Sequence, residues 1–228
     1  MTRHVLTGGL IAGLIAGLFA VLLQLTFVVP LLLEGELYET GARVHFGIGD
    51  PNSIAGSPGI IAEDVARHAG TLAINLVSWI GFAILLMVGF ALASRSGHRI
   101  DARKGTIWGM AGFVAVTLAP AMGLAPELPG TIAADLQARQ IWWAATVVLT
   151  AGGLAALAFG RGPLAIFAGA VAIALPHIVG APTLDTYLGV SPPELSAQFA
   201  ARVLAVSAAI WAVLGAAAGW LWIRSPAA

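Results

Sequence analysis

Long apolar stretches are the feature of this sequence that most restricts how the chain can fold. Six of them cover residues 5–33, 70–93, 105–124, 140–159, 164–180 and 199–223. A helix needs roughly 20 apolar residues to cross the hydrocarbon core of a bilayer. We therefore predict an all-α fold, a polytopic membrane helix bundle with six transmembrane helices, in which residues 1–228 form a single integral membrane domain.

The composition agrees with a membrane protein and excludes several functional classes. Charged residues make up 10% of the chain, whereas a soluble domain carries about a quarter. Eleven bases balance eleven acids, so no basic surface for nucleic acid is expected. Cysteine is absent, which excludes thiolate metal sites and a catalytic cysteine. Neither a phosphate-binding loop nor a hydrolase motif occurs, so we predict that the protein is not an enzyme and has no ATPase of its own.

Two of the apolar stretches leave the topology open. The first, Val5–Leu33, is too long for the core of a signal peptide, so we interpret it as an uncleaved first helix. The stretch 164–180 is the shortest and contains Pro176. A broken or partly re-entrant helix there would leave five spans, which is the alternative to six.

Charged residues are divided unevenly between the two predicted sides of the membrane. Four bases fall within ten residues between the second and third spans: Arg95, Arg99, Arg103 and Lys104. Because short cytoplasmic loops are rich in Lys and Arg, we place both termini in the cytoplasm. All acids except Asp101 then fall on the outer side, where they would concentrate cations. The alternative for some of them is a plain solvated loop charge: Asp50, Glu63 and Asp64.

The chain also shows weak internal similarity. Each predicted outer loop ends in an Ala-Arg pair, at 66–67, 138–139 and 201–202. The odd-numbered spans carry a proline followed by an acid: Pro30 and Glu34, Pro120 and Glu127, Pro176 and Asp185. This pattern indicates three similar hairpins in a pseudo-threefold arrangement, with chance similarity between alanine-rich helices as the alternative. Each proline removes a helical hydrogen bond, so the three breaks would outline a polar vestibule.

Ionisable side chains inside or beside the apolar stretches are the candidate metal ligands, because such groups usually mark a pathway or a site. We predict three principal ligands: Glu34, Glu127 and His177. Glu34 closes the first helix, Glu127 lies in a Pro-Glu-Leu-Pro turn, and His177 follows a proline. Secondary candidates are Glu36, His68, Asp185 and Glu194. Carboxylate and imidazole ligands suit divalent cobalt, nickel or zinc without selecting among them.

Some of the candidate ligands have a structural role as the alternative to metal binding. In that case the glutamates mark the boundary between membrane and water, and His177 hydrogen-bonds to the carbonyl that the proline before it leaves without a donor. We assign structural roles to Pro30, Pro120, Pro176, Arg139 and Arg202, with both arginines paired to loop acids. Trp142 and Trp143 fit an interfacial aromatic belt.

A second functional class stays open. The chain would serve in it as a membrane scaffold or an electron-transfer subunit that binds haem, quinone or partner helices. Gly9, Gly13 and Gly17 lie four residues apart and would permit close approach of another helix in either class. A haem held by two histidines would need facing histidines on spans, and His68 and His177 are the one such pair on the same predicted side.

Several strings of the sequence together resemble the CbtA family: PLLLEGELYE, LAPELPG followed by ARQIWW, and LPHIVGAP with a downstream PPEL. These are small bacterial membrane proteins regarded as probable cobalt transporter subunits, and the resemblance runs from about Leu10 to Gly215. It implies import of Co²⁺ as a substrate across the bacterial inner membrane, with no resident cofactor. The partners it implies are membrane lipid, the divalent ion and a short single-span CbtB-type subunit.

The resemblance also covers most of the candidate residues. Glu34 and Glu36 match the first string, in which Gly35 stands where alanine is usual. The second string matches Pro126, Glu127, Pro129, Arg139, Trp142 and Trp143, and the third matches His177 and Pro182. The resemblance does not assign metal ligands, so the ligand predictions above depend on side-chain chemistry.

Overall fold

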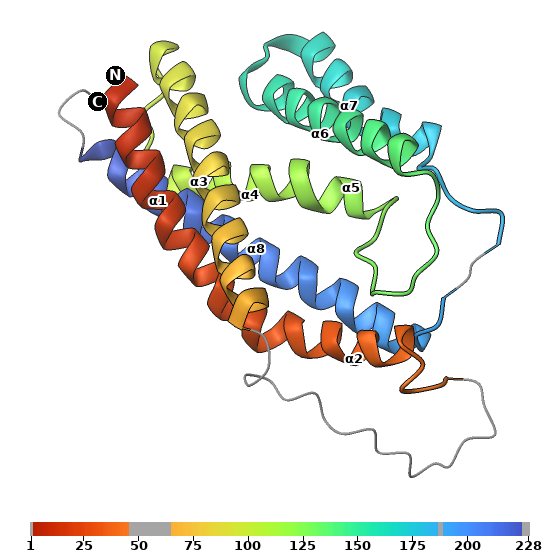
Figure 1. The fold of residues 1–228 in the computed structure, drawn as a ribbon. Coiled ribbons are helices and arrows are strands. Elements are labelled where there is room, and N and C mark those ends of the chain that lie inside the picture. The colour runs from red at the N-terminus through yellow and green to blue at the C-terminus, as the bar shows by residue number, and fades with distance from the viewer. Residues whose placement is uncertain (1, 46–64, 187–188, 225–228) are drawn as a thin grey trace. The chain divides into compact units, whose positions relative to one another are not determined.

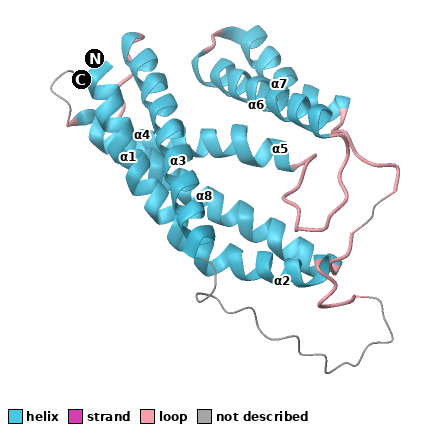
Figure 2. Ribbon diagram, viewed as in Figure 1, coloured by secondary structure: helices cyan, strands magenta, loops and turns pink. Residues whose placement is uncertain are grey.

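The computed structural model describes residues 2–45, 65–186 and 189–224, and every regular element in these ranges is a helix (Figures 1 and 2). The α-helices are α1 Thr2–Leu23, α2 Val29–Glu39, α3 Val65–Arg95, α4 Ala102–Phe113, α5 Ala119–Ala121, α6 Leu136–Phe159, α7 Gly162–Val179 and α8 Pro193–Ile223. Two π-helices, η1 Gln24–Val28 and η2 Val114–Leu118, interrupt this series. The prediction of an all-α membrane protein is confirmed.

Five helical segments are long and apolar enough to cross a membrane: Thr2–Glu39, His68–Arg95, Leu136–Phe159, Gly162–Val179 and Pro193–Ile223. The stretch around Pro176 forms one of them without a break, because the proline lies in the last turn of α7. The predicted span 105–124 is instead assembled from α4, η2 and α5. The structure therefore supports a multi-pass protein, and the sixth span stays a prediction.

Both π-helices lie just before a proline. Each ends two residues before a proline, η1 before Pro30 and η2 before Pro120. A π-helix uses i→i+5 hydrogen bonds and is usually a single wide turn within an α-helix. A proline in the following turn supplies no backbone amide, so the wide turn and the missing donor lie together. In α7, Pro176 stands in a regular helix without a π-turn.

By its internal contacts the chain divides into two compact units. Unit 1 comprises residues 2–27, 65–113 and 205–224, and unit 2 comprises 28–45, 114–186 and 189–204. The chain passes between them within η1, at the start of η2 and within α8. The prediction of a single membrane domain stays a prediction.

Unit 1 is built on contacts between backbones. Helices α1 and α3 pack against each other, and a β-carbon on Gly13 would overlap the Cα of Ile80. Between α4 and α8, a β-carbon on Gly105 would overlap the carbonyl oxygen of Gly215. Small residues allow such close packing where lipid offers no hydrophobic drive for helix association. The glycine spacing in the first helix therefore serves packing within the chain.

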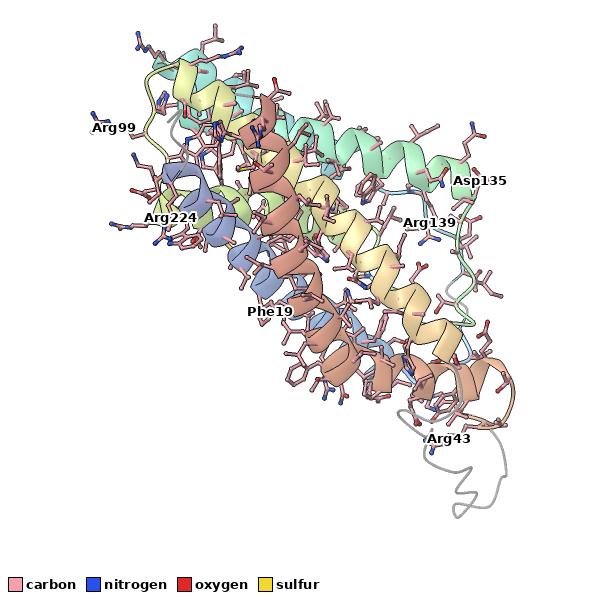
Figure 3. All side chains as sticks on the ribbon, turned by 60° about the vertical axis from the view of Figure 1, so that its left-hand side comes forward. Phe19, Arg43, Arg99, Asp135, Arg139 and Arg224 are labelled. Carbon is pink, nitrogen blue, oxygen red and sulfur yellow. The ribbon has the colours of Figure 1, made fainter. Side chains whose placement is uncertain are left out.

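The bases of unit 1 gather at one end. Helix α1 runs antiparallel to α3, and α4 runs antiparallel to α8, as the contacts of Gly8 with Met87 and of Gly105 with Gly219 show. The start of α1, the end of α3, the start of α4 and the end of α8 therefore lie together (Figure 1). The bases at this end of unit 1 are Arg3, Arg95, Arg99, Arg103, Lys104 and Arg224. Figure 3 labels Arg99 and Arg224 among them.

Unit 2 is centred on α6. Helix α7 crosses it closely, since a β-carbon on Gly153 would lie 2.7 Å from the carbonyl oxygen of Gly169. Elements η2 and α5 also contact α6. The face of α6 that these neighbours cover consists of Trp142, Thr146, Thr150 and Gly153. Gly35 of α2 lies against the side chain of Leu128, so α2 contacts the loop 122–135 that leads into α6.

Candidate functional site

All three principal ligand candidates belong to unit 2. Glu34 lies on α2, Glu127 lies in the loop 122–135, and His177 lies in the last turn of α7. The contact of Gly35 with Leu128 joins the immediate sequence neighbours of the two glutamates, with 2.9 Å from a β-carbon on Gly35 to Leu128 Cδ2. The two glutamates therefore belong to one region of unit 2.

Glu34 is paired with Arg43, whose Nη1 donates to Glu34 Oε1. The turn after α2 explains this pair. Gly41 adopts a φ of +74°, which glycine tolerates without the penalty of a β-carbon. The chain thereby reverses, and the amide of Arg43 donates to the carbonyl of Leu37 at 2.9 Å. The arginine that returns along α2 neutralises a carboxylate that is only 23% exposed.

Glu127 is paired with Arg139. Nη2 of Arg139 donates to Oε2 of Glu127 at 2.7 Å, and the two side chains are 24% and 35% exposed. Asp135 sets the arginine in place, because its carboxylate accepts from the amide of Ala138 at 2.8 Å and caps the start of α6. Figure 3 labels Asp135 and Arg139 at this helix start. The predicted pairing of Arg139 with a loop acid is confirmed.

His177 is half-buried and packs against an aromatic ring. Its imidazole meets Trp142 edge to face, with 6.1 Å between ring centroids and 73° between ring planes. Pro176 leaves the carbonyl of Ala172 without its helical donor, and a hydrogen bond from His177 to this carbonyl was the structural alternative to metal binding. Among the described residues the imidazole makes no such hydrogen bond. The indole Nε1 of Trp142 donates instead to the carbonyl of Pro176, at 3.1 Å.

The secondary candidates are distributed along the chain. Glu36 is half-buried on α2, Asp185 is exposed in the loop after α7, and Glu194 is exposed in the first turn of α8. His68 lies half-buried on α3 and belongs to unit 1, and Arg202 is exposed on α8. Three acids that were assigned to the outer side lie outside the described residues: Asp50, Glu63 and Asp64.

The structure does not bring the principal candidates into a preformed metal site. No group of three His, Cys, Asp or Glu residues within the described ranges is close enough to hold a metal ion. Glu34 and Glu127 each face an arginine, and His177 faces an indole. A cation that uses either carboxylate would therefore compete with a guanidinium for it.

Three features were not predicted from the sequence. Arg43 was not linked to Glu34, although a glycine two residues before it favours a chain reversal. Trp142 is 7% exposed and packs inside unit 2, a contact that the sequence did not predict, whereas Trp143 is 42% exposed.

The third missed feature lies in unit 1. Asn75 is 8% exposed. Its Nδ2 donates to Gln24 Oε1 at 3.0 Å and to the carbonyl of Thr71 at 2.9 Å. The sequence did not link Asn75 to Gln24, because the two residues lie 51 positions apart.

A comparison with protein-family models matches residues 2–223 to the family described as "Probable cobalt transporter subunit (CbtA)". The match covers all the candidate residues and nearly the whole chain, and it confirms the resemblance found in the sequence. No curated protein and no solved structure matches the chain.

Proposed function

The chain belongs to the CbtA family of probable cobalt transporter subunits, and we propose that it is a permeation subunit that imports Co²⁺ across the bacterial inner membrane without an ATPase of its own. The observation that carries this proposal is the make-up of unit 2. Two carboxylates and an imidazole stand in a largely apolar helical unit, and each carboxylate is neutralised by one arginine. Charged groups at such positions usually mark an ion pathway.

The proposed topology has six spans with both termini in the cytoplasm. The continuous helical segment 102–121, with its π-turn, would be the additional span, because it is long enough to cross the hydrocarbon core. The cluster of bases at one end of unit 1 supports a cytoplasmic position for that end. Glu34, Glu127 and His177 then lie toward the outer side. The shared π-turn and proline of the first and third spans support the proposed repeat of hairpins.

In the proposed mechanism the arginines keep cobalt binding reversible. Hydrated Co²⁺ is attracted by the outer acids, displaces a guanidinium group from Glu34 or Glu127, and exchanges part of its water first for carboxylate oxygens and, in a separate step, for a nitrogen of His177. The released arginines stay close and repel the ion. Binding is thereby strong enough for entry and weak enough for release, which conduction requires. Because only neutral imidazole binds a metal, protonation of His177 would lower uptake.

The test is accumulation of radiolabelled cobalt in cells that produce the chain with and without a single-span CbtB-type partner. We expect Glu34→Gln, Glu127→Gln and His177→Ala each to lower accumulation severalfold at unchanged membrane abundance. Glu39→Gln is the matched control, because Glu39 is an exposed acid on the same helix. Wild-type accumulation in all three variants would refute the site, and a Soret band in the purified protein would favour the electron-transfer alternative.

A further inference from the structure

One stretch of α6 contacts the surroundings of two proposed ligands. Arg139 and Trp142 are three residues apart, about one helical turn, near the start of this helix. Arg139 holds the carboxylate of Glu127, and Trp142 contacts the turn that carries His177. The sequence predicts a structural role for Arg139, whereas Trp142 has no role in the proposed function.

The turn that carries His177 is weakly attached to its own helix. Pro176 has no amide hydrogen, so the carbonyl of Ala172 receives no helical bond from it. The turn is closed by the amide of Gly180, which donates to the carbonyl of Pro176 at 3.0 Å. Gly180 ends the helix with a φ of +86°, a conformation that other residues rarely adopt. An additional anchor would therefore restrict the position of His177 substantially.

Trp142 supplies that anchor from the neighbouring helix. Its Nε1 donates to the same carbonyl of Pro176, and its ring packs edge to face with the imidazole. The indole itself has little room to move. A β-carbon on Gly123 would lie 2.6 Å from Trp142 Cη2 and 2.8 Å from the β-carbon of Ala181. The ring is thus enclosed between the segment after α5 and the segment after α7.

We propose that Trp142 is the positioning residue for His177 in cobalt binding, an inference that rests on the function proposed above. The indole fixes the last turn of α7 through its hydrogen bond and limits the orientations of the imidazole through ring contact. A His177 that is held in one place loses less conformational freedom when it binds a cation. Removing the anchor should therefore weaken binding of Co²⁺ at His177 without removing any ligand.

The experiment measures Co²⁺ at His177 directly. The purified full chain in detergent carries isotope-labelled histidine, the His177 signal is assigned with His177→Ala, and paramagnetic broadening is followed as CoCl₂ is added. Trp142→Phe keeps an aromatic ring but removes the donor. We expect it to raise the Co²⁺ concentration for half-broadening by about three- to tenfold, the effect of one lost buried hydrogen bond.

A second variant perturbs the indole without replacing it. Gly123→Ala places a methyl group against Trp142, so it should shift the His177 response in the same direction. Two controls match these changes: Trp143→Phe alters the exposed neighbour, and Gly152→Ala adds a methyl group to α6 where nothing lies within 4 Å. Both should keep the wild-type midpoint within about twofold.

The possible results separate the two proposals. If Co²⁺ broadens His177 in the wild type and the midpoint is unchanged in both Trp142→Phe and Gly123→Ala, the positioning role is refuted and the proposed function stands. If Co²⁺ leaves the wild-type His177 signal unchanged, the ligand assignment fails and the inference fails with it. If Trp142→Phe does not fold, Gly123→Ala decides the question by itself.

Discussion

Replacing Arg139 with glutamine should strengthen the binding of cobalt while it slows transport. The arginine and the metal compete for the carboxylate of Glu127, so the variant removes the competitor and keeps the ligand. A model in which Arg139 merely stabilises the fold predicts the opposite, because the carboxylate would lose its position. The sign of the change in affinity therefore distinguishes competition from a purely structural role.

The geometry of the ion pair between Arg139 and Glu127 sets the expected change in the affinity for cobalt. Two unit charges 2.7 Å apart attract by about 6 kcal/mol at an effective dielectric constant of about 20. Most of this is offset by desolvation and by the entropy of two long side chains that are 24% and 35% exposed. Double-mutant cycles on exposed pairs leave about 0.2–1 kcal/mol. Removing an ion pair that contributes about 1 kcal/mol in competition with the metal corresponds to roughly fivefold tighter binding of Co²⁺.

The assay is calorimetric titration of the purified protein with CoCl₂, combined with initial rates of uptake in cells. Arg139→Gln should lower both the dissociation constant and the maximal rate of uptake. Arg161→Gln, a change at an exposed arginine in the turn before α7, is the control and should alter neither. Weaker or unchanged binding of cobalt by Arg139→Gln would refute the competition mechanism, provided that the variant keeps its helical content.

Two further predictions concern unit 1. Gly105→Ala forces a β-carbon onto the carbonyl of Gly215, so it should lower the free energy of unfolding by about 1–3 kcal/mol, measured by thermal denaturation in detergent. The control is Gly81→Ala, where nothing lies within 4 Å of the added carbon, and it should leave the free energy of unfolding unchanged. Equal stability of the two variants would contradict the described contact. Gln24→Leu and Asn75→Leu should show a coupling energy of about 0.6 kcal/mol in a double-mutant cycle, whereas additive effects would mean that their hydrogen bond contributes nothing.

The helices were predictable because their signal is local. An apolar stretch of some twenty residues must satisfy its own backbone hydrogen bonds in lipid, so the sequence alone determines that it is a helix. The pairing of Arg139 with a loop acid was predictable for a similar reason, although the sequence did not identify Glu127 as that acid. A base at a helix start and an acid in the preceding loop are close in the chain, and both need a partner.

What could not be predicted depends on contacts between distant segments or on backbone register. Trp142 resembles an interfacial tryptophan in sequence, and only the packing of α7 and of the segment after α5 makes it a buried donor. The pairing of Gln24 with Asn75 joins residues 51 positions apart. The π-turns leave no mark in apolar periodicity, because their residues are as apolar as those of the adjoining helices.

The π-turn at residues 24–28 introduces a phase slip into the first long helix. A π-turn is in effect one inserted residue, and each residue of an α-helix turns the chain by about 100°. A helical wheel drawn over Thr2–Glu39 as one regular helix is therefore out of phase for the residues that follow the π-turn. Deleting one residue within Gln24–Val28 should therefore replace the wide turn by a regular α-helical turn, although every residue of α2 would stay the same.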